Sequence, residues 1–226
     1  MTVDSKHKLI LDHEVTNDPT DPGHLSDMAL RAKALLEVKR LEVVADMGYY
    51  DGRQVKACLE AGVKTYIPKP NTSANRPVGL FAKEDFRYVR GGDCYRCPAG
   101  ERLTFRFQTR ELGRDVRYYA TTACTSCRLR PMCTRRADGR RITRSIDEGL
   151  LEAMERRNRA HPEKFKQRKG IVEHPFGTIK RNMNQGYFLT KGLTSVGTEM
   201  SLSVLAYDLL RAMNILGVRR MIRTLS

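Results

Sequence analysis

Two acidic residues stand where a carboxylate could bind a metal ion. Asp46 follows the apolar run at 43–45 and precedes the sequence Met-Gly-Tyr-Tyr. Glu173 lies in RKGIVEHPFGTIKR, residues 168–181, among basic residues and two positions before Pro175. Carboxylate oxygens suit Mg²⁺ or Mn²⁺, and a neighbouring lysine suits a phosphate. This combination is typical of sites that act on phosphodiesters.

Each acid also has a plainer interpretation. Asp46 could only end a strand or cap the next helix, although Asp51 competes for the capping role. Pro175 favours a helix that either kinks there or starts there, so Glu173 is expected near a helix start. Lys180 would then share a face with Glu173 two turns later, and such a pair could be an ordinary surface ion pair.

The elements that must position these acids can be predicted from the hydrophobic pattern. The first part reads as a hairpin at 1–15, a helix at 24–39, a strand at 41–46, a helix at 51–61 ended by Gly62, and a strand at 65–67. From residue 145 the pattern is helical, at about 146–160, 163–187 with a break near Pro175, and 195–216. Phe176, Ile179 and Met183 are expected to form a buried stripe. Strands between helices predict an α/β sheet, whose ligands gather where its strands end.

Five of the six cysteines fall within one short region. They form two C-x₂-C pairs and one later single residue: Cys94, Cys97, Cys124, Cys127 and Cys133. Paired C-x₂-C motifs joined by a β-like segment favour a structural Zn²⁺ site with four sulfurs. The two pairs are the economical ligand set, with Cys133 as a substitute, and free buried thiols are the alternative. Cys58 lies on an apolar helix face and is interpreted as a core residue.

The chain is strongly basic, with 41 Lys and Arg against 26 Asp and Glu and a net charge of +15. Seven arginines fall in residues 128–144, and seven more basic residues in 155–169. Clusters of this kind favour a polyanion such as DNA, whose bound counterions are released on binding; a merely basic enzyme is the alternative. No run of 18 apolar residues and no signal-peptide pattern is present, so a cytoplasmic protein without a membrane partner is expected.

Several motifs together resemble the insertion-sequence transposases of the DDE type, in the order of that family and over nearly the whole chain. They are the hairpin and loop at 3–25, VVADMGYYDG (43–52), IPKP (67–70), GIVEHPFGTIKR (170–181) and TEMSLSVLAYDLLRAMNILG (198–217). The resemblance implies a ribonuclease-H-like mixed sheet flanked by helices. Residues 1–80 and 145–226 would form the catalytic core, and 81–144 a small Cys-rich and Arg-rich β insertion, with helices closing the chain.

The resemblance also assigns roles to residues. In that family three acids bind two divalent cations, Mg²⁺ or Mn²⁺. The second acid, in an Asp-x-Gly-Tyr context, matches Asp46, and the third, a Glu with a Lys seven residues later, matches Glu173 and Lys180. Where the family has a tyrosine and an arginine before the Glu, this chain has Lys166 and Lys169. The expected DNA contacts beside the acid are Lys169, Lys180 and Arg181. The arginine cluster just after the cysteines, independently of the resemblance, adds Arg135, Arg136, Arg140 and Arg141 as expected DNA contacts.

The first acid of the family has no counterpart in this chain. It would lie on a strand upstream of the first hairpin, and none of Asp4, Asp12, Asp18 and Asp21 matches it. The chain is therefore expected to be the C-terminal part of a transposase catalytic domain, inactive alone. The intact family cleaves DNA at the element's ends and joins them to target DNA, and a homo-oligomer is compatible with this. The alternatives are a zinc-stabilised, non-catalytic DNA-binding or regulatory fragment and an inert product.

Overall fold

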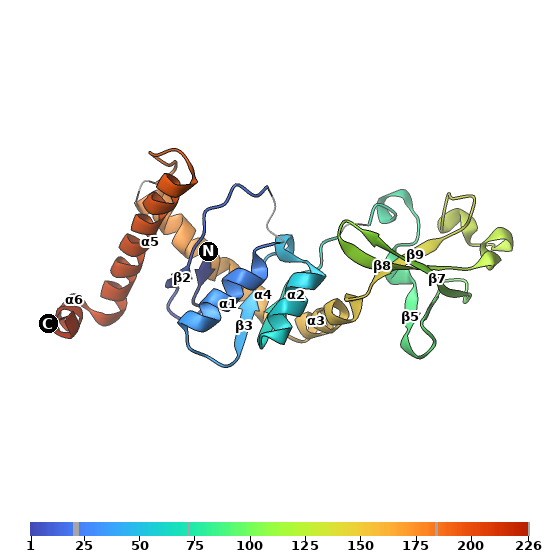
Figure 1. Ribbon diagram of the computed structural model, residues 1–226, viewed down its shortest axis with the longest axis horizontal. Coiled ribbons are helices and arrows are strands. Elements are labelled where there is room, and N and C mark those ends of the chain that lie inside the picture. The colour runs from blue at the N-terminus through green and yellow to red at the C-terminus, as the bar shows by residue number, and fades with distance from the viewer. Residues whose placement is uncertain (20–22, 72, 184, 226) are drawn as a thin grey trace. The chain divides into compact units, whose positions relative to one another are not determined.

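The computed structural model describes residues 1–19, 23–71, 73–183 and 185–225 (Figure 1). Asp21 lies outside them. The chain divides into two compact units, Met1–Lys69 with Leu150–Ser226, and Pro70–Gly149. The mixed α/β class predicted from the sequence is confirmed. Among the described residues, no helix has both the length and the apolar character needed to cross a membrane.

The first unit contains two small sheets. Strands β1 (Thr2–Val3) and β2 (Ile10–Asp12) pair antiparallel, and β3 (Leu41–Val44) and β4 (Val63–Tyr66) pair parallel, from Leu41 opposite Val63 to Val44 opposite Tyr66. Helix α1 (Leu25–Leu35) precedes β3, and α2 (Gly52–Glu60) joins β3 to β4. Helix α1 ends four residues before its predicted end, and Glu37 beyond it has a positive φ of 51°. The predicted C-terminal glycine of α2, Gly62, has the expected left-handed backbone with φ 75°.

The core of these elements is apolar and includes Cys58. Its buried members come from α1, α2, β4, the residue after β4, and α3: Leu25, Ala29, Val55, Cys58, Val63, Ile67 and Met154. Cys58 is fully buried, and burial raises the pKa of its thiol to about 11. The predicted core role of Cys58 is confirmed by its burial in this cluster, and a thiol in such apolar surroundings stays protonated.

Four helices and one π-helical turn, among the described residues, complete the first unit, and the first of them begins two residues before this part of the unit. They are α3 (Glu148–Ala160), α4 (Glu163–Gly177), the π turn Thr178–Asn182, α5 (Leu193–Leu216) and α6 (Val218–Leu225). The predicted break near Pro175 is wrong, because α4 runs through this buried proline. Proline supplies no amide hydrogen, so the hydrogen-bond ladder must adjust nearby. The wider turn just beyond it, where the Met183 amide donates to the Thr178 carbonyl, is such an adjustment.

The segment after Pro175 packs against α5 and the first hairpin. Ile179 is buried with Ile10, Val204 and Tyr207, and Met183 packs against them, as the predicted stripe requires. The third member of that stripe was predicted wrongly, since Phe176 is 40% exposed. The π turn changes the angular spacing along the helix, so a regular α-helical stripe does not persist across it.

His174 ties α4 to α5 and to the hairpin turn. The Tyr207 hydroxyl donates to the Lys8 carbonyl at 2.7 Å, and His174 Nδ1 lies 3.0 Å from the same hydroxyl. Because the Tyr207 proton is used by Lys8, His174 Nδ1 carries a hydrogen and donates it. Two more hydrogen bonds join α5 to the hairpin. Arg211 Nε donates to the His7 carbonyl at 2.6 Å, and the Ile10 amide donates to Asp208 Oδ1 at 2.9 Å.

The second unit is a five-stranded antiparallel sheet with strands in sequence order (Figure 1). Its strands are β5 (Arg87–Val89), β6 (Cys94–Arg96), β7 (Arg102–Glu111), β8 (Arg114–Ala120) and β9 (Arg141–Ser145). Short 3₁₀ turns occupy Arg76–Val78, Lys83–Asp85, Arg90–Gly92, Thr122–Ser126 (η5) and Arg130–Met132 (η6). The core consists of Phe86, Tyr95, Leu103, Tyr119 and Ile142.

Asp51 is the N-cap of α2, as the sequence predicts. Its buried carboxylate accepts from the amides of Arg53 at 2.9 Å and Gln54 at 3.3 Å. We expect Asp51→Ala to lower the free energy of unfolding by about 1–2 kcal/mol, because two amides lose their acceptor. Asp51→Asn keeps an acceptor oxygen, so it should retain most of the stability that the cap contributes. Urea denaturation measures both, and equal stability of the alanine variant and the wild type would contradict this capping role.

His174 should make stability depend on pH. Burial, and to a smaller degree the charges of Lys8 and Arg211, lower the pKa of His174 below its ordinary value. The unfolded chain then binds the proton more readily, so stability should fall as pH drops below about 6.5, the pKa of free histidine. His174→Gln keeps a donor but does not titrate, so its stability should change less between pH 7.5 and 5.5. The exposed His161→Gln is the control, and identical pH profiles for His174→Gln and wild type would refute the assignment.

Candidate active site

Asp46 lies directly beyond the carboxyl end of β3, where the sequence places it. Its Oδ1 accepts from the Met47 amide at 2.8 Å, so it caps the 3₁₀ turn Met47–Tyr49 (η1). Its Oδ2 lies 3.4 Å from Nη1 of Arg168 on α4. The capping alternative therefore holds for this short turn, whereas Asp51 caps α2. The Asp46 side chain is still 55% exposed, so other ligands can reach it.

One face of α4 lies along β3. Lys164 donates a short hydrogen bond to Glu42 of β3, and its ammonium lies 4.5 Å from the centre of the Tyr66 ring in β4. This bond lowers the pKa of Glu42 and raises the pKa of Lys164. Lys164 and Arg168 are four residues apart and so lie on the same side of the helix. Two cations thus connect α4 to a strand acid and to the acid after the strand.

Glu173 is carried by the same helix but not by the same face. It follows Arg168 by five residues, which corresponds to about 7.5 Å along the axis and about 140° around it. Its carboxylate is 66% exposed and lies 4.0 Å from the ammonium of Lys169. The prediction that Glu173 lies near a helix start is wrong, because α4 begins at Glu163 and continues through Pro175.

The cations expected to hold DNA near Glu173 are all exposed. Lys169 lies one turn before the acid, and Lys180 and Arg181 lie in the π turn after it. These positions do not test the predicted DNA contacts of the three residues. They show that each side chain is accessible to a ligand. Lys169 is the basic residue among them that contacts Glu173, at 4.0 Å.

The arginines of the insertion differ in their surroundings. Arg135 and Arg136 are exposed, while Arg136 and Arg141 lie 3.8 and 3.4 Å from Asp138. The Arg140 guanidinium instead lies 5.3 Å from the centre of the Phe86 ring. Its Nε is buried and has no hydrogen-bond partner in the described part of the chain.

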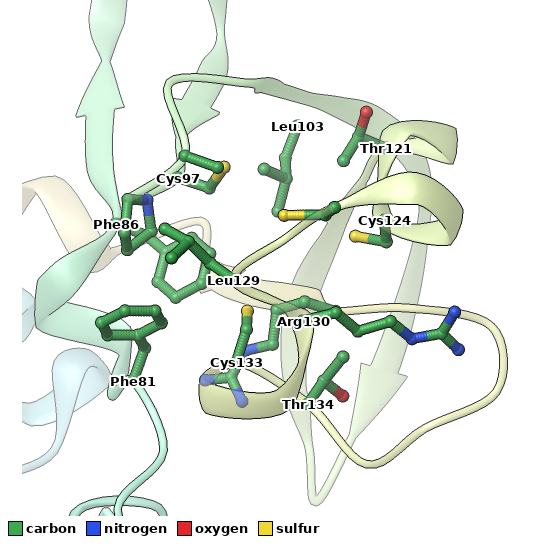
Figure 2. A pocket seen from close by; sticks show the side chains of 14 residues that line it. Phe81, Phe86, Cys97, Leu103, Thr121, Cys124, Leu129, Arg130, Cys133 and Thr134 are labelled. Atoms are coloured by element: carbon green, nitrogen blue, oxygen red, sulfur yellow. The ribbon is translucent and has the colours of Figure 1, made fainter.

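Four of the five clustered cysteines surround one small cavity (Figure 2). Its lining includes Cys97, Cys124, Cys127 and Cys133, together with Arg130 and Arg140, and its volume is about 20 Å³. Cys94 is not among the lining residues and is 1% exposed. Burial raises the pKa of the Cys133 thiol, Arg140 opposes this, and the other three thiols act in the same direction as burial. As placed, no three His, Cys, Asp or Glu side chains among the described residues form a group that could hold a metal ion.

Two residues were not selected from the sequence although the structure makes them central. Arg168 contacts Asp46, and His174 fixes the helix turn that bears Glu173. Arg168 could have been selected from the sequence, because its four-residue spacing from Lys164 marks one basic face of a helix that follows an α/β unit. No comparable signal marks His174, whose partners are more than 30 residues distant.

A family model described as Transposase DDE domain matches residues 96–213, more than half of the chain. The matched region contains Glu173, Lys180 and the four cysteines of the cavity, and Asp46 lies before it. No curated protein and no solved structure gives a significant match. The family match confirms the resemblance drawn from the motifs, and the chain belongs to the DDE-domain transposases.

Proposed function

We propose that this chain supplies two of the three acids of a transposase active site, Asp46 and Glu173, which together bind Mg²⁺ or Mn²⁺. The observation that supports it most is the contact between Arg168 and Asp46, because it joins the helix of Glu173 to the end of β3. In this proposal, residues 1–80 and 145–226 belong to a ribonuclease-H-like catalytic core, and residues 81–144 form an insertion that contacts DNA.

Each carboxylate can give up its present partner at small cost, and a cation shared by both requires Glu173 to move from the side of α4 that it now occupies. The Arg168–Asp46 contact is 3.4 Å long at a half-exposed carboxylate, and the Lys169–Glu173 contact is 4.0 Å long between exposed groups. Ion pairs of this kind contribute little to stability, typically below about 1 kcal/mol. Arg168 and Lys169 would then be free to contact DNA phosphates near the acids that they neutralise in the absence of a cation.

The chemistry follows from the residue types. A bound pair of divalent cations supplies Lewis-acid stabilisation of the attacking and leaving oxygens of a phosphodiester. Asp46 and Glu173 provide hard oxygen ligands for such cations. Lys169, Lys180 and Arg181 would hold the DNA backbone beside them, with element-end and target DNA as substrates. The third acid is not assigned to any residue of this chain, so we propose that the chain alone does not cleave DNA.

A second candidate is non-catalytic DNA binding. Both proposed metal ligands are paired with cations, and no third acid is assigned, which favours a protein that binds DNA without cleaving it. In this candidate the insertion, stabilised by a structural Zn²⁺, and the basic surface of α4 provide the DNA contacts.

The two candidates differ in a plasmid-nicking experiment. The chain alone should leave supercoiled DNA intact in Mg²⁺ or Mn²⁺, whereas a protein extended upstream by an acid-bearing strand should nick it. In the extended protein, Glu173→Gln should reduce the rate by at least about 100-fold, the loss expected when several kcal/mol of metal-based stabilisation disappear. Glu163→Gln, also exposed on α4, is the matched control. Undiminished nicking by Glu173→Gln would refute its assignment, and nicking by the chain alone would refute its inactivity.

DNA binding through the insertion can be tested by its salt dependence. Arg135→Ala should weaken binding to unrelated DNA sequences alike and reduce the slope of log K against log[salt] by about 1, the value for one lost phosphate contact. Arg110→Ala, at an exposed arginine on β7 of the same unit, should leave the slope unchanged. Fluorescence anisotropy at several salt concentrations measures both, and equal slopes for Arg135→Ala and wild type would contradict the predicted contact.

A further inference from the structure

We propose that Cys97, Cys124, Cys127 and Cys133 together bind one Zn²⁺, and that Cys94 is a core thiol and not a ligand. This set differs from the two C-x₂-C pairs that sequence spacing alone makes economical. The ligand assignment stands without the catalytic proposal, because it rests on residues of the second unit only.

The four thiols come from three separate segments that meet at one cavity (Figure 2). Cys97 follows β6, Cys124 and Cys127 lie in and directly after η5, and Cys133 directly follows η6. The cavity volume of about 20 Å³ exceeds the roughly 10–15 Å³ that a single water requires. Phe81, Phe86 and Leu103 supply apolar parts of the wall. The cavity is therefore a place for one atom-sized guest surrounded by sulfur.

Strand alternation explains why Cys94 is excluded. Cys94 and Tyr95 are adjacent in β6, so their side chains point to opposite faces of the sheet. Tyr95 belongs to the buried cluster against which Cys97 and Cys133 pack. Cys94 lies on the other face, where its sulfur would be 3.5 Å from a Cβ added to Gly92. Cys94 and Cys97 are therefore close in the sequence but lie on opposite faces of the sheet.

The cavity also has the charge that a four-thiolate zinc site needs. One Zn²⁺ with four thiolates carries a net charge of −2, and two arginines, Arg130 and Arg140, line the cavity. The buried Nε of Arg140 has no acceptor among the described residues, and a thiolate would provide one. The four sulfurs are not grouped for coordination in this structure, so zinc binding requires them to change rotamer. Metal binding commonly supplies the free energy for such ordering.

The metal would hold the loop that carries the exposed arginines. Arg130 donates from Nη2 to the carbonyls of Arg136 and Ala137, which fixes this loop to η6. At its other end Gly139 has a φ of 84°, and an added Cβ would lie 2.7 Å from the Cβ of Cys124. Two zinc ligands, Cys133 and Cys124, thus flank the loop that presents Arg135 and Arg136. Zinc removal should loosen this loop and weaken its DNA contacts, an effect that rests on the proposed DNA binding.

Metal content of the purified full chain tests the ligand set. Elemental analysis should find one zinc per wild-type chain, and one also in Cys94→Ala and Cys58→Ala. Serine substitutions of the four proposed ligands should each remove most of the zinc. Loss of zinc in Cys94→Ala with retention in Cys133→Ser would overturn the proposal in favour of the paired set, and a zinc-free wild type would overturn it outright.

Cobalt substitution keeps the test independent of folding defects in the serine variants. Wild type and Cys94→Ala reloaded with Co²⁺ should show the same intense thiolate-to-cobalt absorption typical of four-sulfur tetrahedral coordination, and a weaker spectrum in Cys94→Ala would count against the set. Zinc removal should weaken DNA binding by about tenfold, as expected for the loss of a few phosphate contacts. One zinc with the predicted ligands but unchanged DNA affinity would refute only the DNA-binding effect.

Discussion

The attachment of α4 to β3 is the interaction on which the proposed active site depends. Two cations of one helix face, Lys164 and Arg168, meet two acids of one strand and its end, Glu42 and Asp46. These partners are separated by more than 100 residues, and the whole second unit lies between them in the sequence. Without these contacts, no described ion pair or hydrogen bond would join the helix of Glu173 to the acid that follows β3.

The same charges therefore have two roles in this account. Arg168 lies 3.4 Å from Asp46 and Lys169 lies 4.0 Å from Glu173, so each of the two carboxylates has a cation beside it. In the proposed active site a divalent cation would replace them, and the two basic side chains would become available to the phosphates of DNA. Because both contacts are long and both carboxylates are more than half exposed, loss of each ion pair requires little free energy. A basic protein can in this way keep acids at a site where DNA must approach.

Local features of the fold were predictable from sequence, whereas features set by distant partners were not. The Asp51 cap, the left-handed Gly62 and the helix–strand alternation before Pro68 follow from local backbone chemistry, and the structure has them. Pro175 was predicted to break a helix, but burial against neighbouring elements keeps it within α4. For the cysteines, spacing favoured Cys94 as a partner of Cys97, whereas strand alternation separates them. Local sequence does not predict the contact between Arg168 and Asp46, because the two residues are 122 positions apart in the chain.

The most direct test of the proposed active site is to locate bound Mn²⁺. Anomalous diffraction from crystals of the chain soaked in Mn²⁺ would locate the cation and its ligands. The account predicts a manganese peak bonded to carboxylate oxygens of both Asp46 and Glu173, with Arg168 displaced from Asp46. A peak bonded to only one of them, or the two carboxylates remaining on different sides of α4 in the presence of the cation, would contradict it.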